Sequence, residues 1–167
     1  MAEEEAATTG STEQAQQQFT LQRIFLKDLS FESPGAPKVF AEEWKPSMNV
    51  DLNTRSGVIS GDNYEVVLTV TITAKTNEET VYLIEVQQAG IFLIRGIAGE
   101  ALRRVLATVC PSTLFPYARE TIDSVVSRGT FPAVMLAPVN FEALFQQALR
   151  QAEAEAAAPA GEDPTTH

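Results

Sequence analysis

The sequence has almost none of the residues on which most enzyme active sites are built. Its single histidine is His167 and its single cysteine is Cys110. A general base needs a fixed position, which the last residue of a polar tail does not offer, and one cysteine excludes an intrachain disulfide. The sequence also lacks a phosphate-binding Gly-Lys-Ser or Gly-Lys-Thr motif and any local cluster with metal-ligand spacing. We therefore expect no enzymatic activity, no metal and no cofactor; only an enzyme that uses Asp and Glu alone stays open.

Positive charge is scarce as well, and all of it lies in the middle of the chain. Lys and Arg number 12 against 22 Asp and Glu, which gives a net charge of −10. Residues 1–18 and 151–167 contain acids but no Lys or Arg. We predict that these ends are disordered acidic arms around one domain at 19–150, although Ala152–Ala158 suits a continuation of the preceding helix. Because nucleic-acid binding requires clustered basic residues and Arg103–Arg104 is the only adjacent pair, we expect no nucleic-acid partner.

Long apolar runs and a basic N-terminal signal are also missing. No stretch approaches the ~20 apolar residues that span a bilayer. Residues 1–5 are acidic, whereas an export signal begins with basic residues. The sequence therefore predicts a cytoplasmic protein that does not insert into the membrane.

The first half of the predicted domain shows the alternation typical of β-strands. In Tyr64–Lys75 every second residue is apolar, and a short polar turn separates this segment from Thr80–Phe92. The close spacing favours an antiparallel hairpin. Phe19–Phe31 and Met48–Thr54 are predicted as two further strands. Since both faces of Thr80–Phe92 carry apolar residues, we expect that the second face of the sheet is an oligomer or binding surface.

A proline-rich segment and its aromatic neighbours form the candidate binding region. Residues 32–46 contain three prolines and are predicted to form a long ordered loop, which in a compact domain often has a function. Aromatic residues flank this loop and the second predicted helix, namely Phe31, Phe40, Trp44, Phe115, Tyr117 and Phe131. The strand after the loop presents Met48, Val50 and Leu52 on one face. These side chains are either ordinary core or the lining of a groove that binds extended apolar peptides, at roughly 25 cal/mol per Å² buried.

The second half of the domain is predicted to be helical. Apolar residues recur at helical spacing in Ala98–Val109, Leu114–Arg128 and Phe141–Arg150. Pro111 is expected to end the first helix, and Asn140 is a good N-cap for the third. Strands followed by helices indicate an α+β fold, here a four-stranded antiparallel sheet with the C-terminal helices packed on one side.

The second predicted helix carries three local expectations. Pro116 suits a first helical turn. Arg119 and Asp123 stand at the i, i+4 spacing of an ion pair. Gly129 is expected just after the end of the helix, where a left-handed residue is common.

Several segments resemble the family of SecB protein-export chaperones. The segments that carry the resemblance are Asp28–Glu32 with Pro34, Pro37 and Phe40, then Glu85–Phe92, Cys110–Glu120, Val126–Pro132 and Leu136–Phe141. The stretches Ser-Arg-Gly-Thr-Phe-Pro at 127–132 and Leu-Ala-Pro-Val-Asn-Phe at 136–141 are the most specific. Together the similarity covers about residues 19–150.

This resemblance implies a homotetramer, built as a dimer of dimers, that acts as an ATP-independent holdase in the bacterial cytoplasm. Members of the family bind unfolded precursor proteins and deliver them to the export ATPase SecA. A SecB-like chaperone that serves a toxin–antitoxin system is the alternative, and the acidic residues at the positions named next favour export.

Matching positions also imply roles for individual residues. The SecA-docking positions are Asp28, Glu32, Leu83 and Glu85, which would form an acidic surface. The positions of subunit association are Ile84, Val86 and Gln88. The client-groove positions are Phe40 and Trp44, to which the local patterns add Met48, Val50, Leu52, Tyr117 and Phe131.

Overall fold

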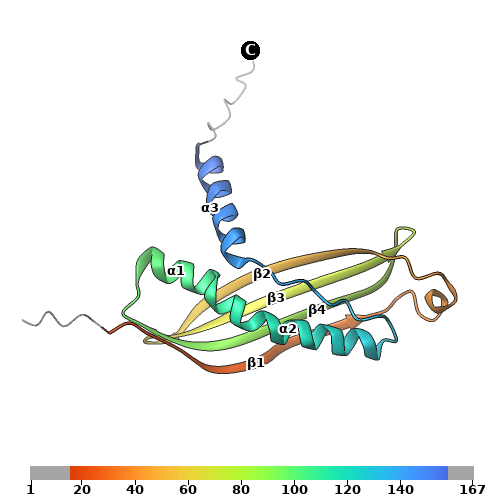
Figure 1. Cartoon of the computed structure of the whole chain (residues 1–167), viewed down its shortest axis with the longest axis horizontal. Coiled ribbons are helices and arrows are strands. Elements are labelled where there is room, and N and C mark those ends of the chain that lie inside the picture. Colours follow the sequence, from red (N-terminus) through yellow and green to blue (C-terminus); the bar gives the residue numbers. More distant parts are fainter. Residues whose placement is uncertain (1–15, 158–167) are drawn as a thin grey trace, which may run out of the picture.

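A computed structural model describes residues 16–157 of the chain. Four long strands form one antiparallel sheet in the order β1-β4-β3-β2, so that β1 and β2 are the edges (Figure 1). The strands are β1 Gln18–Glu32, β2 Ser47–Ser60, β3 Asn63–Thr76 and β4 Glu79–Arg95. The predicted four-stranded sheet is confirmed, whereas most of the predicted N-terminal arm, the end of the C-terminal tail and His167 lie outside the described residues.

Strand β2 is longer than its sequence pattern indicated. The prediction ended it at Thr54, but pairing with β3 continues from Ser47 opposite Lys75 to Ser60 opposite Asn63. Gly61, with a φ of 55°, makes the tight turn between the two strands. The Ser-Gly pair at 56–57 resembles a turn in sequence, yet the hairpin keeps it extended because the ladder beside it is unbroken.

The proline-rich loop is ordered, as predicted. It contains one short 3-10 helix, η1 Lys38–Ala41, and it lies beside the start of β4. The Ser33 hydroxyl donates a hydrogen bond of 3.3 Å to the Val81 carbonyl oxygen. This contact ties the loop to the end of the sheet near the β3–β4 hairpin (Figure 1).

The helices begin and end at different residues from those predicted. They are α1 Gly99–Ala107, α2 Val109–Arg128 and α3 Phe141–Ala157. Thr108, with φ −124° and ψ −62°, makes the break between α1 and α2. Pro111 therefore does not end α1 but lies in the first turn of α2, where its missing N–H has no helical partner to lose. Pro116, predicted for a first turn, lies inside α2 instead.

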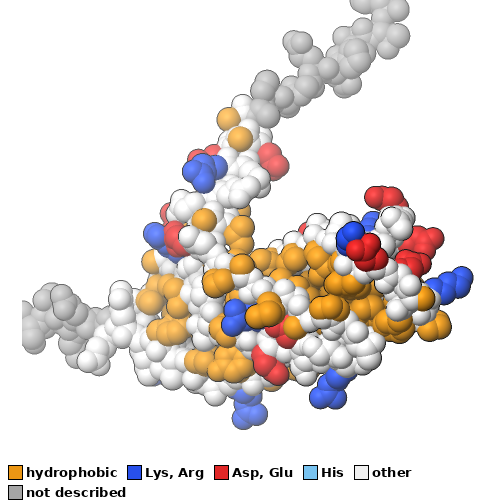
Figure 2. Space-filling view, turned by 45° about the vertical axis from the view of Figure 1, so that its right-hand side comes forward, with side chains coloured by type: hydrophobic (Ala, Val, Ile, Leu, Met, Phe, Trp, Pro, Cys, Tyr) orange, Lys and Arg blue, Asp and Glu red, His pale blue; other side chains and the backbone are white. Residues whose placement is uncertain are grey.

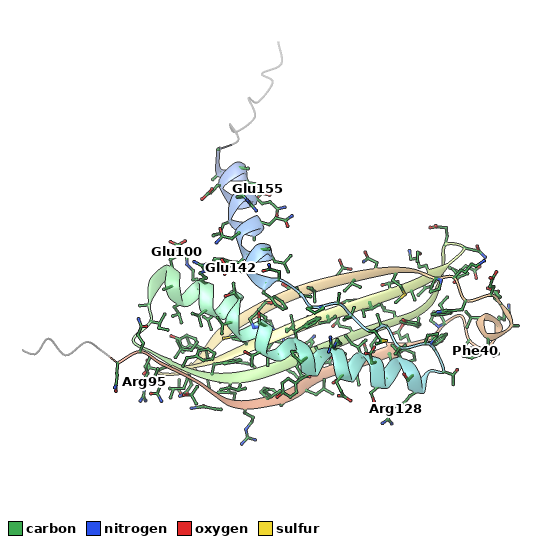
Figure 3. All side chains as sticks on the ribbon, viewed as in Figure 1. Phe40, Arg95, Glu100, Arg128, Glu142 and Glu155 are labelled. Atoms are coloured by element: carbon green, nitrogen blue, oxygen red, sulfur yellow. The ribbon has the colours of Figure 1, made fainter. Side chains whose placement is uncertain are left out.

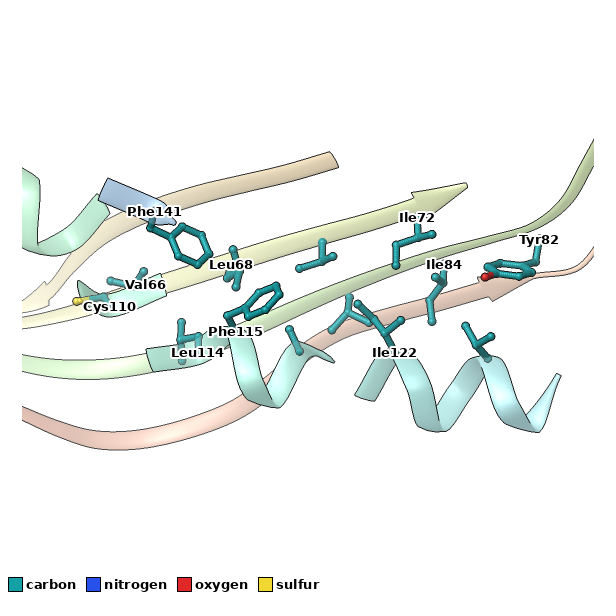
Figure 4. Close-up of a cluster of buried hydrophobic side chains, with 14 of the residues drawn as sticks. Val66, Leu68, Ile72, Tyr82, Ile84, Cys110, Leu114, Phe115, Ile122 and Phe141 are labelled. Atoms are coloured by element: carbon teal, nitrogen blue, oxygen red, sulfur yellow. The ribbon is translucent and has the colours of Figure 1, made fainter. Parts of the chain in front are cut away.

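Helix α2 packs across β4 and β3 and builds the core with them (Figure 4). The buried residues come from alternate strand positions and one stripe of the helix, and include Val66, Leu68, Val70, Ile72, Tyr82, Ile84, Val86, Leu114, Ala118, Ile122 and Val126. The positions predicted for subunit contacts, Ile84, Val86 and Gln88, lie in or beside this core, and their role in assembly stays a prediction. The first two have no exposed surface within the single chain, and Gln88 donates a hydrogen bond of 2.9 Å to the Phe25 carbonyl oxygen.

Gly129 lies at the end of α2, but the reason for glycine differs from the predicted one. Its φ is −72°, so it is not left-handed; Thr130, with a φ of 63°, adopts that conformation instead. A Cβ at Gly129 would lie 2.7 Å from Cζ of Phe31. The position therefore requires glycine because β1 and the end of α2 approach each other closely.

Helix α3 projects away from the sheet (Figures 1 and 3). Asn140 caps it as predicted, since its Oδ1 accepts a hydrogen bond of 2.9 Å from the Ala143 N–H. Arg104 of α1 holds its first turn through an ion pair of 2.7 Å to Glu142. Hydrogen bonds from Gln146 and then Arg104 lower the pKa of Glu142. The helix runs to Ala157, as the helix continuation over Ala152–Ala158 indicated, so residues 151–157 belong to α3.

Among the helices of the described part, none combines the length and the apolar composition that crossing a bilayer requires. Likewise, residues 16–157 contain no group of three or more His, Cys, Asp or Glu side chains able to hold a metal ion. Cys110 is buried at the start of α2, and this burial raises the pKa of its thiol to about 12.

Candidate functional site

Five aromatic side chains from four separate segments meet at the loop end of the sheet. We call Phe31, Phe40, Trp44, Tyr82 and Phe131 the aromatic cluster. The ring centroid of Phe131 lies 5.4 Å from that of Phe40, 5.5 Å from that of Trp44 and 5.0 Å from that of Tyr82. Trp44 also stacks on Tyr82 at 6.4 Å, and Phe31 lies 5.9 Å from Tyr82. Such spacings are those of favourable aromatic pairs.

The cluster has an exposed layer and a buried floor. Phe40 is 52% exposed and Trp44 is 36% exposed, whereas Phe131 is 5% exposed and Tyr82 is fully buried. Figure 3 shows Phe40 at the end of the molecule that carries the loop. Phe131, predicted to line the groove surface, is therefore the floor on which Phe40 and Trp44 rest.

Strand β2 extends this apolar surface away from the aromatic cluster. Met48, Val50 and Leu52 pair with Ala74, Ile72 and Val70 and share the helix-facing side of the sheet. Met48 and Val50 are each 40% exposed because α2 packs on β4 and β3 and not on this edge strand. Figure 2 shows hydrophobic side chains gathered over the body of the molecule, bordered by charged groups at its loop end. The predicted residues of the loop and β2 thus form one exposed apolar surface, connected through Tyr82, which contacts both Trp44 and Met48. We call this surface the candidate groove.

The segment between α2 and α3, residues 131–140, lies along α2 as a connector. The Oδ1 atom of Asp123 accepts hydrogen bonds from the N–H groups of Val134, at 2.9 Å, and Met135, at 3.0 Å. Arg119 donates a hydrogen bond of 3.3 Å to the Leu136 carbonyl oxygen. The expected ion pair between Arg119 and Asp123 is therefore wrong: both side chains hold the backbone of the connector.

Tyr117, which the sequence assigned to client binding, lies on a different side of α2 from the connector. It is half exposed on α2, but it lies about 120° around the helix from Asp123 and about 160° from Arg119 at 3.6 residues per turn. Since those two residues face the connector, Tyr117 points away from it, and its assignment to client binding stays a prediction. The number of aromatic residues near α2 does not indicate which side of the helix each of them faces.

The opposite face of the sheet brings together the four predicted docking residues. Asp28 pairs with Gln87, and Glu32 with Leu83, so their side chains share the face of Glu85. Glu85 accepts hydrogen bonds of 3.3 Å from Thr71 and from Gln87. Around Leu83 this face is polar and is built from Asn49, Asp51, Asn53, Thr69, Thr71, Thr73 and Gln87. Toward the other end of the sheet the same face carries Phe25, Val67, Ala89, Ile91 and Leu93, so the second face is partly apolar, as expected.

Edge strand β1 presents a third exposed surface. Phe19, Leu26 and Leu29 lie on its helix-facing side and are exposed beyond α2. Within the described residues, the outer backbone edge of β1 has no partner strand. Unpaired edges next to apolar side chains favour association with another chain.

Sequence patterns missed the roles of two residues, Tyr82 in the aromatic cluster and Asp123 at the connector. Tyr82 is the centre of the aromatic cluster, and its alternation with Ile84 pointed only to the core. Burial and then the charge of Asp123 raise the pKa of Tyr82 to about 12. The i, i+4 spacing assigned Asp123 to an ion pair with Arg119. Its partners in the structure are backbone N–H groups 11 and 12 residues away, which local spacing does not reveal.

The family model "Preprotein translocase subunit SecB" matches residues 12–152. A protein-export protein SecB of Marinobacter nauticus is 54% identical over 99% of both chains. The SecB of Azotobacter vinelandii is 54% identical, covering 90% of this chain and 94% of its own. A solved SecB-like chaperone of Mycobacterium tuberculosis, in complex with an antitoxin peptide, has a TM-score of 0.60 at 16% identity, over 72% of this chain and 87% of its own. With the fold, these similarities over nearly the full length show that the chain belongs to the SecB family of protein-export chaperones.

Proposed function

We propose that this protein is an ATP-independent holdase of the cytoplasm. It binds unfolded precursor proteins, keeps them competent for translocation and delivers them to SecA. The observation that carries this proposal is the exposed apolar surface formed by Phe40, Trp44 and the adjacent side chains of β2. The export relatives at 54% identity support it over service to a toxin–antitoxin system.

Client capture follows from the composition of the groove. Phe40 and Trp44 offer rigid aromatic surface, and Met48 adds an unbranched side chain that adapts to different shapes. Burial of apolar surface contributes roughly 25 cal/mol per Å² and requires no particular sequence. A folded protein has its apolar residues inside, so this groove selects unfolded chains.

Docking of SecA is assigned to the opposite face of the sheet. Asp28, Glu32 and Glu85 bring three carboxylates around Leu83, which suits a basic segment of the partner with one apolar contact. Placing the two sites on opposite faces lets the protein hold a client and its receiving ATPase at once.

Self-association into a homotetramer, a dimer of dimers, is part of the proposal. The residues that we assign to it are those of the β1 surface, Phe19, Leu26 and Leu29. Pairing of two β1 edges would extend the sheet across subunits and cover these side chains. The positions that the resemblance implies, Ile84, Val86 and Gln88, are buried within the single chain and would act through the strand that they hold in place.

Light scattering tests the function. We expect the wild-type protein to suppress aggregation of a urea-unfolded protein diluted into buffer without nucleotide, and to have the mass of four chains. Failure of a fourfold molar excess to slow aggregation of every client tried would overturn the proposal. A dimeric mass would overturn only the tetramer.

A further inference from the structure

The buried hydroxyl of Tyr82 has an unusual partner. Its Oη atom donates to the Sδ atom of Met48 at 4.0 Å. A thioether is a weak acceptor, and Tyr82 itself is fully buried. A buried donor with so weak a partner is poorly satisfied, and it points at the sulfur of a groove residue.

Met48 is open to solvent on its other side. It is 40% exposed and lies where the apolar strip of β2 meets the aromatic cluster. Tyr82, its partner, stacks with Trp44 at 6.4 Å. A small oxidant can therefore reach the side chain of Met48 from solvent. The hydroxyl of Tyr82 lies on the buried side of its sulfur.

We propose that Met48 is an oxidation site through which hydroperoxides weaken client capture. This inference rests on the proposed holdase function. In the reaction the thioether sulfur attacks hydrogen peroxide, the O–O bond breaks, one oxygen bonds to sulfur, and water leaves. Sulfur loses two electrons, peroxide gains them, and a methionine sulfoxide reductase reverses the change.

Tyr82 determines the orientation of the product. Because the methionine side chain has three rotatable bonds, an oxygen added from the solvent side can turn toward Tyr82. The Oη and Sδ atoms are 4.0 Å apart, which leaves room for an O–H···O hydrogen bond of 2.5–3.0 Å to the sulfoxide oxygen. Burial keeps the hydroxyl protonated, with a pKa of about 12, so that it donates at any physiological pH. This hydrogen bond favours a sulfoxide held over the aromatic cluster instead of one turned into water.

A polar group fixed at this point weakens binding of apolar clients. A client that covers the sulfoxide removes it from water, and its oxygen has only Tyr82 as a compensating donor. The adaptable thioether surface is lost as well. We expect affinity for an unfolded client to fall about fivefold to tenfold.

Met135 provides an internal comparison. It is 77% exposed on the connector, and so oxidises readily, but its side chain has no hydrogen-bond partner among the described residues corresponding to Tyr82. Oxidation at Met135 leaves its sulfoxide free to hydrate, and we expect little change in client affinity.

The experiment measures client affinity before and after hydrogen peroxide in wild type, Met48→Leu, Met135→Leu and Tyr82→Phe. Carboxymethylated α-lactalbumin, which stays unfolded, is the client, and peptide mass spectrometry measures oxidation at each methionine. The ratio of oxidised to reduced affinity is compared within each variant. Leucine is nearly isosteric with methionine, and circular dichroism checks that each variant is folded.

We expect the peroxide-induced loss in wild type and Met135→Leu, no loss in Met48→Leu, and a smaller loss in Tyr82→Phe, whose sulfoxide can turn to solvent. An equal loss in Met48→Leu, or unchanged binding by wild type oxidised at Met48, overturns the inference. Full loss in Tyr82→Phe overturns the part assigned to Tyr82. If reduced wild type does not bind the client at all, the proposed function fails and this inference with it.

Discussion

The ring edge of Phe31 on β1 lies directly against the backbone of Gly129 at the end of α2. A Cβ added to Gly129 would lie 2.7 Å from Cζ of Phe31 and 3.1 Å from Cδ2 of Phe131. Both phenylalanines belong to the aromatic cluster, so this one close approach joins β1, α2 and the candidate groove.

Gly129→Ala is expected to destabilise the fold and disturb the cluster. The added methyl group forces Phe31 or the helix end to move, at a cost of about 1–3 kcal/mol. Urea unfolding measures the loss. Gly57→Ala is the matched control, because a Cβ there meets nothing within 4 Å; equal stability of the two variants would contradict the packing argument.

Asp123→Asn is expected to loosen the connector. The variant keeps an acceptor oxygen but loses the charge that strengthens two hydrogen bonds from backbone N–H groups, so we expect about 1–2 kcal/mol less stability. Because the charge of Asp123 is the second cause of the raised pKa of Tyr82, that pKa should fall while remaining above its ordinary value. Spectrophotometric titration of tyrosinate tests the sign, and a rise would contradict the assignment.

Glu85→Lys is expected to abolish docking of SecA while client binding persists. The substitution reverses a charge in the centre of the acidic surface, and the groove lies on the other face of the sheet. We expect at least a tenfold loss of affinity for SecA. Glu120→Lys, an equal charge reversal at an exposed position of helix α2, serves as the control. Unchanged SecA affinity in Glu85→Lys would favour service to a pathway other than export.

Cys110 is expected to be inert in the folded protein. Burial raises its thiol pKa to about 12, so the reactive thiolate is almost absent at pH 8. Iodoacetamide should therefore leave the native protein unmodified and alkylate it fully in urea. Rapid labelling of the native protein would show that the start of α2 opens readily. The thiol pKa is higher in the folded protein than in the unfolded one. The free energy of unfolding therefore decreases as pH rises above the unfolded thiol pKa of ~8.5.

Sequence patterns predicted those helices and strands that are determined by residues within or next to the element itself. Strict alternation predicted β3, and Asn140 predicted the start of α3, because a cap needs only the next turn of chain. The predicted end of α1 at Pro111 was wrong because a proline suits both the end of one helix and the first turn of the next. The break at Thr108 has no sequence signal of its own.

Contacts between distant segments could not be predicted in the same way. The need for glycine at position 129 comes from Phe31, almost a hundred residues earlier, and the partners of Asp123 are backbone groups of the connector. The alternation in β4 gave the two faces of that strand, but not that α2 would cover Ile84 and Val86. The resemblance to SecB supplied the docking positions, which the register then brought onto one face.

Calorimetric titration of carboxymethylated α-lactalbumin tests the central claim most directly, without nucleotide, against wild type, the Phe40→Ala/Trp44→Ala double variant and Val58→Ala. Val58 is exposed at the other end of β2, outside the groove. We predict that the double variant binds at least tenfold more weakly than wild type and that Val58→Ala binds within twofold of it. Equal binding by the double variant and wild type, or no binding by any of the three, would contradict the account.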